Sequence, residues 1–183
     1  FVVPSTGTRQ TARAVAATGA LGGDAVLVSL SKGLEYRTLN TLTAEIAEEL
    51  PHHAAVALSG PCIASEVAAG MPTTIVAASD DKNAAQTVQD AFMTPVFRVY
   101  TSDDPQGVQL GGALKNIIAI AAGICDGLGF GDNAKSALMT RGIVEMTRFG
   151  VLRGAKAETF NGLSGIGDLM TTCMSSHSRN RRV

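Results

Sequence analysis

Short apolar runs alternate with segments of helical spacing from residue 1 to residue 102, and this alternation defines the fold class. The runs are FVV (1–3), AVLVSL (25–30), AAVALSG (54–60), TTIVAAS (73–79) and VFRVYTS (96–102). Continuous apolar strands separated by amphipathic helices are typical of a parallel sheet that is covered on both faces. The pattern therefore predicts a doubly wound α/β fold.

The pattern changes after residue 102, where no further strand signal appears. A helix is expected from Pro105, with an acidic residue as its cap, and a second long helix over 131–152 with Asp132 as its N-cap. Shorter helical pieces follow over 158–163 and 167–174. We expect a division near 102–104, with an α/β part before it and an all-helical part after it.

Composition narrows the classes of partner. Hydrophobic residues make up 45% of the chain and charged residues 17%, which favours a packed core over disorder. Fifteen basic and sixteen acidic residues give a net charge of -1, so neither nucleic acid nor an anionic membrane is expected as the main partner. The three cysteines, Cys62, Cys125 and Cys173, suggest neither a disulfide framework nor a metal site, and a reducing cytoplasm fits them.

The stretch LGGALKNIIAIAAGI (110–124) places one lysine, Lys115, among small and apolar residues. Two interpretations compete: a lysine at a helix edge with its ammonium in water, or a lysine held at a reaction centre. Lys115, Asn116 and Asp126 interrupt the apolar run. A buried helix of a soluble protein is therefore favoured over a membrane span.

Ligands of open parallel sheets bind beyond the carboxyl ends of the strands. Lys32 follows strand 25–30 and is suited to a phosphate, although a surface lysine is an equal alternative. Gly60 and Cys62 follow strand 54–60. Gly60 permits close backbone approach, and the helix start after it would lower the pKa of Cys62, unless that cysteine is only a packed residue. Strand 96–102 leads into the helix that carries Lys115.

Two further segments carry polar groups. Asp168 follows glycines in GLSGIGDLM and is either a ligand contact or a helix cap. Ser178, Arg179 and Asn180 lie in HSRNRR (177–182), which either binds phosphate or is a solvated basic run. GLGFGDN (127–133) joins two predicted helices, so we reject it as a dinucleotide loop, which needs a preceding strand.

The chain resembles the bacterial NAD(P)-dependent sn-glycerol-3-phosphate dehydrogenases in SLSKGLE, LSGPCIASEVAAGMPTTIVAAS, the long block from FRVYTS to LRGAK, and GLSGIGDLMTTCMSSHSRNRR. The resemblance implies a partial Rossmann-type NAD(P)-binding domain over 1–102 and an incomplete helical substrate domain over 103–183. It also implies reversible hydride transfer between NAD(P)H and dihydroxyacetone phosphate, which gives sn-glycerol 3-phosphate for phospholipid synthesis in the cytoplasm.

The resemblance also assigns roles to single residues. Lys115 of GALKN is the expected proton acceptor, and Lys32 of SKG contacts both cofactor and substrate. The expected substrate contacts are Lys32, Gly60, Cys62, Asp168, Ser178, Arg179 and Asn180, and the expected cofactor contacts are Lys32, Ala64 and Arg179. Cys62 departs from the family, which usually has Ser or Thr there, and a thiol is a weaker hydrogen-bonding group.

The resemblance leaves several expectations open. The cofactor is NAD or NADP without a metal, the substrate is a small three-carbon phosphate, and the oligomeric state is unassigned, a homodimer included. Because the family's glycine-rich first βα turn lies upstream of Phe1, we expect an internal fragment that is inactive alone. The alternatives are another Rossmann-plus-helices dehydrogenase, acting on a hydroxy or keto acid, and a non-catalytic packing module.

Overall fold

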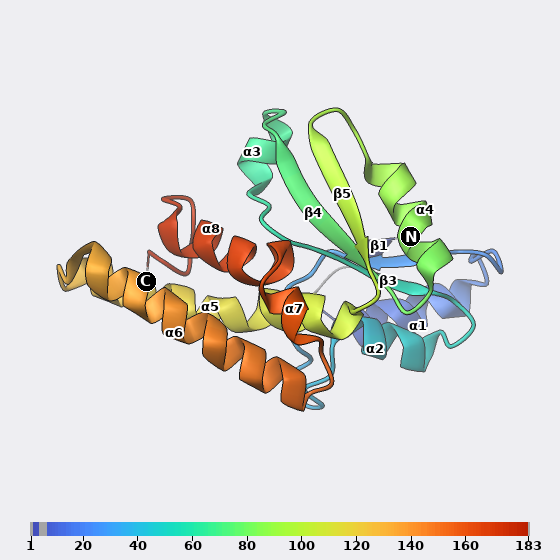
Figure 1. The fold of residues 1–183 in the computed structure, drawn as a ribbon. Coiled ribbons are helices and arrows are strands. Elements are labelled where there is room, and N and C mark those ends of the chain that lie inside the picture. The colour runs from blue at the N-terminus through green and yellow to red at the C-terminus, as the bar shows by residue number, and fades with distance from the viewer. Residues whose placement is uncertain (1, 4–6, 183) are drawn as a thin grey trace.

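A five-stranded sheet forms one end of the molecule (Figure 1). The structure, a computed structural model, describes residues 2–3 and 7–182. Within this part the strands are β1 (Val2–Val3), β2 (Leu27–Ser29), β3 (Ala55–Ser59), β4 (Thr73–Ala78) and β5 (Phe97–Ser102), in the order β1-β2-β3-β4-β5. Each lies inside an apolar run that predicted a strand, and the described residues after Ser102 contain no further strand.

The expectation of an all-parallel sheet is wrong at one pairing. Strand β4 is antiparallel to β3, with Ala57 opposite Ala78, whereas the other three pairings are parallel. The connection from β3 to β4 holds only the short helix α3 (Ala64–Ala68). A helix of that length rises only about 7 Å, shorter than the helices that connect the parallel strands, and the chain reverses here.

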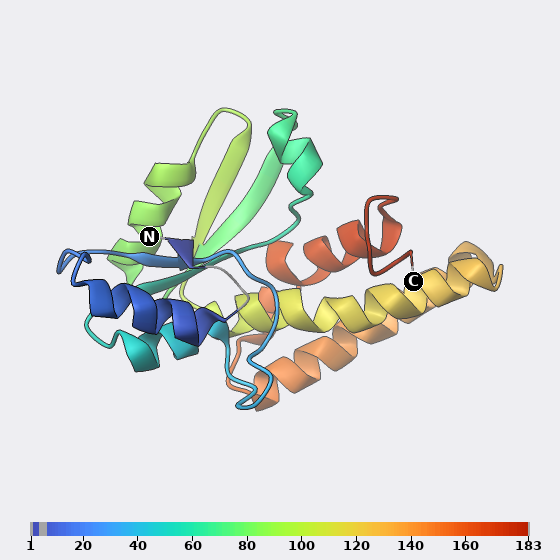
Figure 2. The same cartoon turned by 180° about the vertical axis from the view of Figure 1, so that it is seen from behind.

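Helices pack on the sheet and extend away from it. Helix α2 (Leu42–Glu49) lies beside β2 and β3, α1 (Thr8–Thr18) packs on α2 and beside β1, and α4 (Lys82–Phe92) covers β4 and β5. Figures 1 and 2 show α5 (Pro105–Gly127), α6 (Gly131–Leu152) and α8 (Asp168–Met174) extending from the sheet as a helical layer. The short helix α7 (Ala157–Phe160) and the π-helical turn η1 (Leu163–Gly167) join α6 to α8.

The N-terminal caps of the two long helices differ. Asp104 caps α5 as expected, because its carboxylate accepts from the Gly107 amide at 2.8 Å. Asp132 does not cap α6: the N-cap is Phe130, and Asp132 lies in the first turn. A carboxylate in the first turn still interacts favourably with the helix dipole without receiving a capping hydrogen bond.

Helix α5 carries the chain from the end of the sheet where β5 stops to the end where β2 and β3 stop. Strand β5 is parallel to β4 and therefore runs opposite to β3. Its carboxyl end at Ser102 pairs with Ala78, at the end of the sheet where β3 begins. Val108 then packs on Ala57 and Val76, and a side chain at Gly112 would meet Ser59 at the end of β3. Lys115 therefore reaches the carboxyl ends of β2 and β3 through the helix rather than by following directly after a strand end.

Close contacts at glycines define the helical layer. A Cβ atom at Gly111 would lie 2.3 Å from the Ser164 carbonyl oxygen, and one at Gly150 would lie 2.1 Å from the Phe160 ring. Only glycine permits these approaches.

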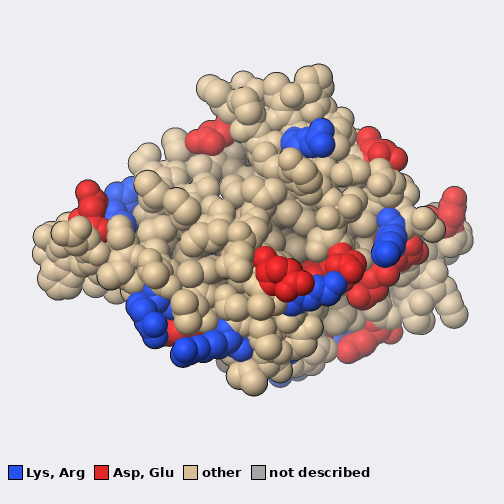
Figure 3. Space-filling view, in the orientation of Figure 1, with Lys and Arg blue, Asp and Glu red and all other residues tan. Residues whose placement is uncertain are grey.

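By length and composition alone, α5 is long and apolar enough to cross a membrane. In this molecule 44% of its apolar 18-residue stretch is buried against the rest of the protein. On the face shown in Figure 3, acidic and basic side chains are interspersed.

Candidate active site

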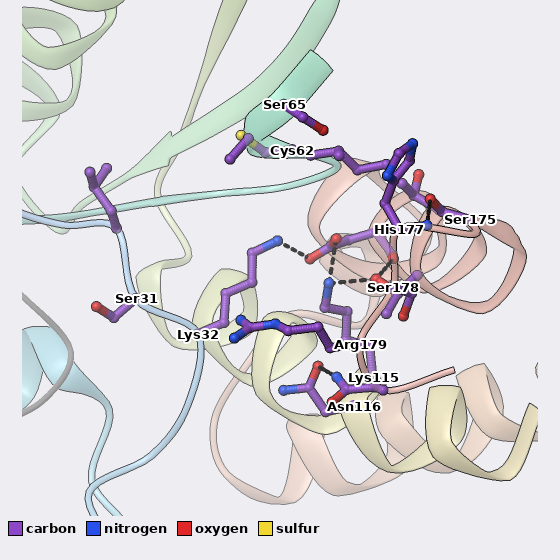
Figure 4. Close-up of a pocket in the computed structure, with 17 residues that line it drawn as sticks. Ser31, Lys32, Cys62, Ser65, Lys115, Asn116, Ser175, His177, Ser178 and Arg179 are labelled. Carbon is purple, nitrogen blue, oxygen red and sulfur yellow. Dashed lines mark hydrogen bonds and ion pairs between the residues drawn. The ribbon is translucent and has the colours of Figure 1, made fainter. Parts of the chain in front are cut away.

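An open cavity of about 1000 Å³ lies between the carboxyl end of β2, helix α3, helices α5 and α8, and residues 175–180 (Figure 4). Its lining includes eight of the nine residues predicted from sequence: Lys32, Cys62, Ala64, Lys115, Asp168, Ser178, Arg179 and Asn180. The ninth, Gly60, contacts the site through its carbonyl oxygen, which accepts from Lys32 Nζ at 2.8 Å. The fold therefore gathers these nine positions around one space.

Asp168 lies at the centre of the site and is 1% exposed. Its Oδ1 accepts from Lys115 Nζ at 2.6 Å and its Oδ2 from Lys32 Nζ at 2.7 Å. Asp168 is the first residue of α8, but its carboxylate is directed at the two lysines and makes no capping bond. The helix-cap interpretation of Asp168 is therefore wrong, because two ammonium groups use both carboxylate oxygens.

Lys115 is buried, with 5% exposure, so it is not a lysine whose ammonium reaches into bulk water. Besides Asp168, its ammonium donates to Thr172 Oγ1 at 2.6 Å. Burial, followed by the positive charge of Lys32, lowers the pKa of Lys115 from its ordinary value of 10.5 to about 8, against the opposing influence of Asp168. A lysine with this pKa exchanges a proton near neutral pH.

Both lysines keep donor capacity for a ligand. An ammonium group has three N–H donors. Lys115 uses two of them on Asp168 and Thr172, and Lys32 uses two on Asp168 and the Gly60 carbonyl. One donor of each ammonium is therefore left for an oxygen atom in the cavity.

The backbone at Gly60 requires glycine. Its φ of 147° lies in a region that other residues rarely adopt, and a Cβ there would lie 3.3 Å from Ile75 Cα.

The thiol of Cys62 differs from the sequence-based expectation. Cys62 is exposed and lines the cavity, yet the protein around its sulfur raises the thiol pKa through desolvation. The positive charges of Lys32 and Lys115 only partly oppose this effect. The expected lowering by a helix N-terminus is wrong because α3 has only five residues and begins after Ile63. Cys62 is a neutral thiol at neutral pH.

The segment of residues 175–180 contributes the far wall of the cavity. Asn180 Nδ2 donates to Asn116 Oδ1 at 2.7 Å, next to Lys115 on α5. Ser178 Oγ accepts from the Arg181 amide at 3.2 Å. Arg179 is exposed at the cavity, and within residues 2–3 and 7–182 its guanidinium makes no hydrogen bond or ion pair that would occupy it. Its donors are available to an anion.

Sequence reasoning missed Asn116, Thr172 and His177 as cavity residues. Thr172 follows Asp168 by four positions on α8, so helical spacing alone places the two on one face. Asn116 directly follows Lys115. His177 precedes Ser178 and has no local pattern that separates it from a surface histidine. No group of three or more potential metal ligands occurs in the described part of the chain.

Two models of one protein family match this chain. Residues 1–85 match the family described as NAD-dependent glycerol-3-phosphate dehydrogenase N-terminus, and residues 104–183 match its C-terminus counterpart. A glycerol-3-phosphate dehydrogenase [NAD(P)+] of Desulfitobacterium hafniense is 55% identical over 181 residues, which cover 99% of this chain and 51% of the relative. One from Clostridium perfringens is 54% identical over 165 residues, covering 90% and 50%.

Solved structures with a similar fold carry the same family name as these relatives. The crystal structure of glycerol-3-phosphate dehydrogenase from Coxiella burnetii superimposes with a TM-score of 0.91 at 40% identity, covering 99% of this chain and 55% of that chain. The structure titled DsGPDH of Dunaliella salina gives 0.89 at 28% identity, covering 100% and 31%. This chain spans about half the length of the curated relatives that it matches.

Proposed function

Because this chain belongs to the NAD-dependent glycerol-3-phosphate dehydrogenase family, we propose that it carries the substrate site of an enzyme that interconverts dihydroxyacetone phosphate and sn-glycerol 3-phosphate. The observation that supports this most is the arrangement of Lys115, Lys32 and Asp168 beside Arg179 in one cavity. It combines a proton-exchanging group with cationic groups that bind phosphate.

Charge balance supports a phosphorylated substrate. The two ammonium groups and Asp168 together carry one net positive charge when Lys115 is protonated, and Arg179 adds another. A phosphate monoester carries a charge between about −1.5 and −2 at neutral pH, which matches this excess. Arg179 has a planar fork of donors suited to phosphate oxygens, and Ser178 and Asn180 lie beside it on the cavity wall.

Lys115 is proposed as the proton donor and acceptor. In ketone reduction its remaining N–H binds the substrate carbonyl oxygen and delivers a proton to the oxygen as the alcohol forms. In alcohol oxidation neutral Lys115 takes that proton back. Asp168 and Thr172 orient the ammonium and stabilise its charge, while burial keeps the pKa near 8 so that both directions proceed.

The residues present fit part of a dinucleotide site. When bound, NAD or NADP supplies or accepts the hydride. The cavity is larger than a three-carbon phosphate needs, and exposed Leu30 together with Ala64 offers an apolar wall at the strand ends where dinucleotides bind in such sheets. We propose Lys32, Ala64 and Arg179 as the contacts to the cofactor from this chain.

Several wider assignments accompany this proposal. The α/β part, residues 1–102, is proposed as part of the cofactor domain, and residues 103–183 as the substrate domain. A cytoplasmic location, a role in supplying glycerol phosphate for phospholipids, the absence of nucleic acid and membrane partners, and a homodimeric state stay predictions. So does the inactivity of the 183-residue chain alone.

A substrate comparison tests the proposal. In a full-length enzyme carrying this sequence, NADH or NADPH oxidation is followed with dihydroxyacetone phosphate, dihydroxyacetone and a set of keto acids. We expect turnover with the phosphate ester and a loss of kcat/KM of at least about 100-fold without it, because the cationic groups of the cavity then lose the anion that they would bind. Preference for a non-phosphorylated keto acid would contradict the proposal and favour the other dehydrogenase class.

A further inference from the structure

The segment that carries Ser178, Arg179 and Asn180 is fastened to helix α5 by groups outside the cavity. Arg181 lies at the centre of this attachment. Its Nε donates to Asp126 Oδ2 at 2.7 Å, and its Nη1 donates to the Met174 carbonyl oxygen at 2.7 Å. One guanidinium therefore connects the last turn of α5 to the end of α8.

Backbone contact reinforces this attachment. A Cβ atom at Gly123 of α5 would lie 2.2 Å from the Arg181 carbonyl oxygen and 2.8 Å from its carbonyl carbon. Both atoms belong to the backbone, so no side chain could rotate away to relieve the overlap. The absence of a side chain at position 123 is thus what allows the segment to lie directly on α5.

Asp126 also binds a second cation. Lys135 of α6 forms an ion pair with Asp126 Oδ1, so that Asp126 links α5, α6 and the segment. The hydrogen bonds from Lys135 and Arg181 lower the pKa of the Asp126 carboxyl, which therefore stays ionised through the neutral range. Asp126 and Arg181 each keep part of their side chain in solvent.

We infer that Asp126 and Arg181 are positioning residues that hold residues 175–182 against α5 and thereby aim Arg179 and Asn180 into the cavity. This inference rests on the proposed function. Neither residue touches the substrate space. Arg181 acts through its neighbours: its amide donates to Ser178 Oγ, and two positions before it Arg179 faces the cavity. A displaced segment weakens phosphate binding but leaves Lys115 in place on α5.

The test separates substrate affinity from chemistry. In the full-length enzyme, Arg181→Gln and Asp126→Asn are expected to raise the KM for dihydroxyacetone phosphate by about tenfold with kcat changed less than about threefold, because small misplacements of binding groups cost affinity steeply. Arg181→Lys is expected to recover part of the affinity, since a lysine replaces one of the two contacts. Gly123→Ala is expected to give the same rise in KM.

Arg182→Gln is the matched control. It removes the same charge at the next position, and the side chain of Arg182 makes no hydrogen bond or ion pair within the described range. We expect it to leave KM within about twofold. Hydrogen exchange of the amides of residues 175–182 gives a second readout, with faster exchange expected in Arg181→Gln, Asp126→Asn and Gly123→Ala but not in Arg182→Gln.

The outcomes are distinguishable from those of the proposed function. Unchanged KM and unchanged exchange in both variants would overturn the inference, as would an equal rise in KM for Arg182→Gln. If the unaltered enzyme does not turn over dihydroxyacetone phosphate, the proposed function fails, and the exchange measurement still decides whether Asp126 and Arg181 hold the segment.

Discussion

Lys32 and Lys115 donate to opposite oxygens of the same buried carboxylate, Asp168, at 2.7 and 2.6 Å. The two lysines come from different layers of the molecule, one from the loop after β2 and the other from α5. Two ammonium groups this close repel each other, and the shared carboxylate offsets that repulsion.

Replacing Lys115 tests its proposed role in proton transfer. Lys115→Met keeps an unbranched apolar stem but removes the ammonium, while Asp168 retains Lys32 as its partner. We expect kcat to fall by about 10²–10⁴-fold, the usual contribution of a general acid or base. Cofactor affinity, measured by fluorescence titration, should stay within about threefold. Turnover close to that of the unaltered enzyme would contradict the role of Lys115.

The pH dependence of the two directions follows from the pKa of Lys115, which is about 8. Ketone reduction needs the protonated form, so its kcat/KM should fall as pH rises through about 8. Alcohol oxidation needs the neutral form, so its kcat/KM should rise over the same interval. Initial rates in both directions between pH 6 and about 10 provide the measurement. Parallel profiles in the two directions would rule out Lys115 as the titrating group.

Replacing the shared carboxylate changes both stability and titration. Asp168→Asn leaves the buried ammonium of Lys115 and the half-buried ammonium of Lys32 without their counter-charge, and breaking a buried pair such as Lys115–Asp168 costs about 3–5 kcal/mol. Urea unfolding should show this loss in free energy of unfolding. The pKa of Lys115 should fall further, because Asp168 raises it and Lys32 lowers it. The descending limb of the reduction profile should therefore move to lower pH, and a limb that stays in place would refute this account.

Glycine packing between α5 and η1 is testable with a matched pair of substitutions. Gly111→Ala places a Cβ 2.3 Å from the Ser164 carbonyl oxygen, so we expect a loss of about 1–3 kcal/mol in free energy of unfolding. Gly127→Ala, at the end of the same helix, meets no atom within 4 Å. It should leave stability unchanged or raise it by up to about 1 kcal/mol. Equal effects of the two substitutions would show that the close approach does not matter.

Cysteine labelling distinguishes the three thiols. Cys62 is exposed, Cys125 is intermediate, and Cys173 is buried with its pKa raised to about 11. Iodoacetamide should label Cys62 first, slowly at pH 7 because its thiol pKa is raised, and faster at higher pH. Glycerol 3-phosphate should slow this labelling. Labelling of Cys173 before Cys62 in the folded protein would contradict the structure.

Local sequence patterns predicted most elements of the fold. The apolar runs and the helical spacings correspond to β1–β5 and to the long helices, because each depends on residues close together in the chain. The direction of β4 was not predictable in this way. It depends on how far α3 extends, and helix ends are decided by a few local contacts that periodicity does not describe.

The site was predicted through motifs rather than geometry. Lys32, Lys115 and Asp168 each had a structural alternative of similar weight when judged from their neighbours alone. The resemblance to a family named the residues, but it supplied neither the lowered pKa of Lys115 nor its contact with Thr172. Both depend on α5 and α8 packing side by side, with glycines at the contacts.

The sequence by itself determined the order of strands and helices along the chain and the change to an all-helical part after residue 102. Only the tertiary structure decided that Lys115 is buried, that Lys32 and Lys115 share Asp168, and that Arg181 fastens the segment bearing Arg179 to α5. The physical reason is that burial and charge pairing depend on the distances between distant parts of the chain. Those distances are set by the antiparallel turn at β4 and the close helix contacts that follow it.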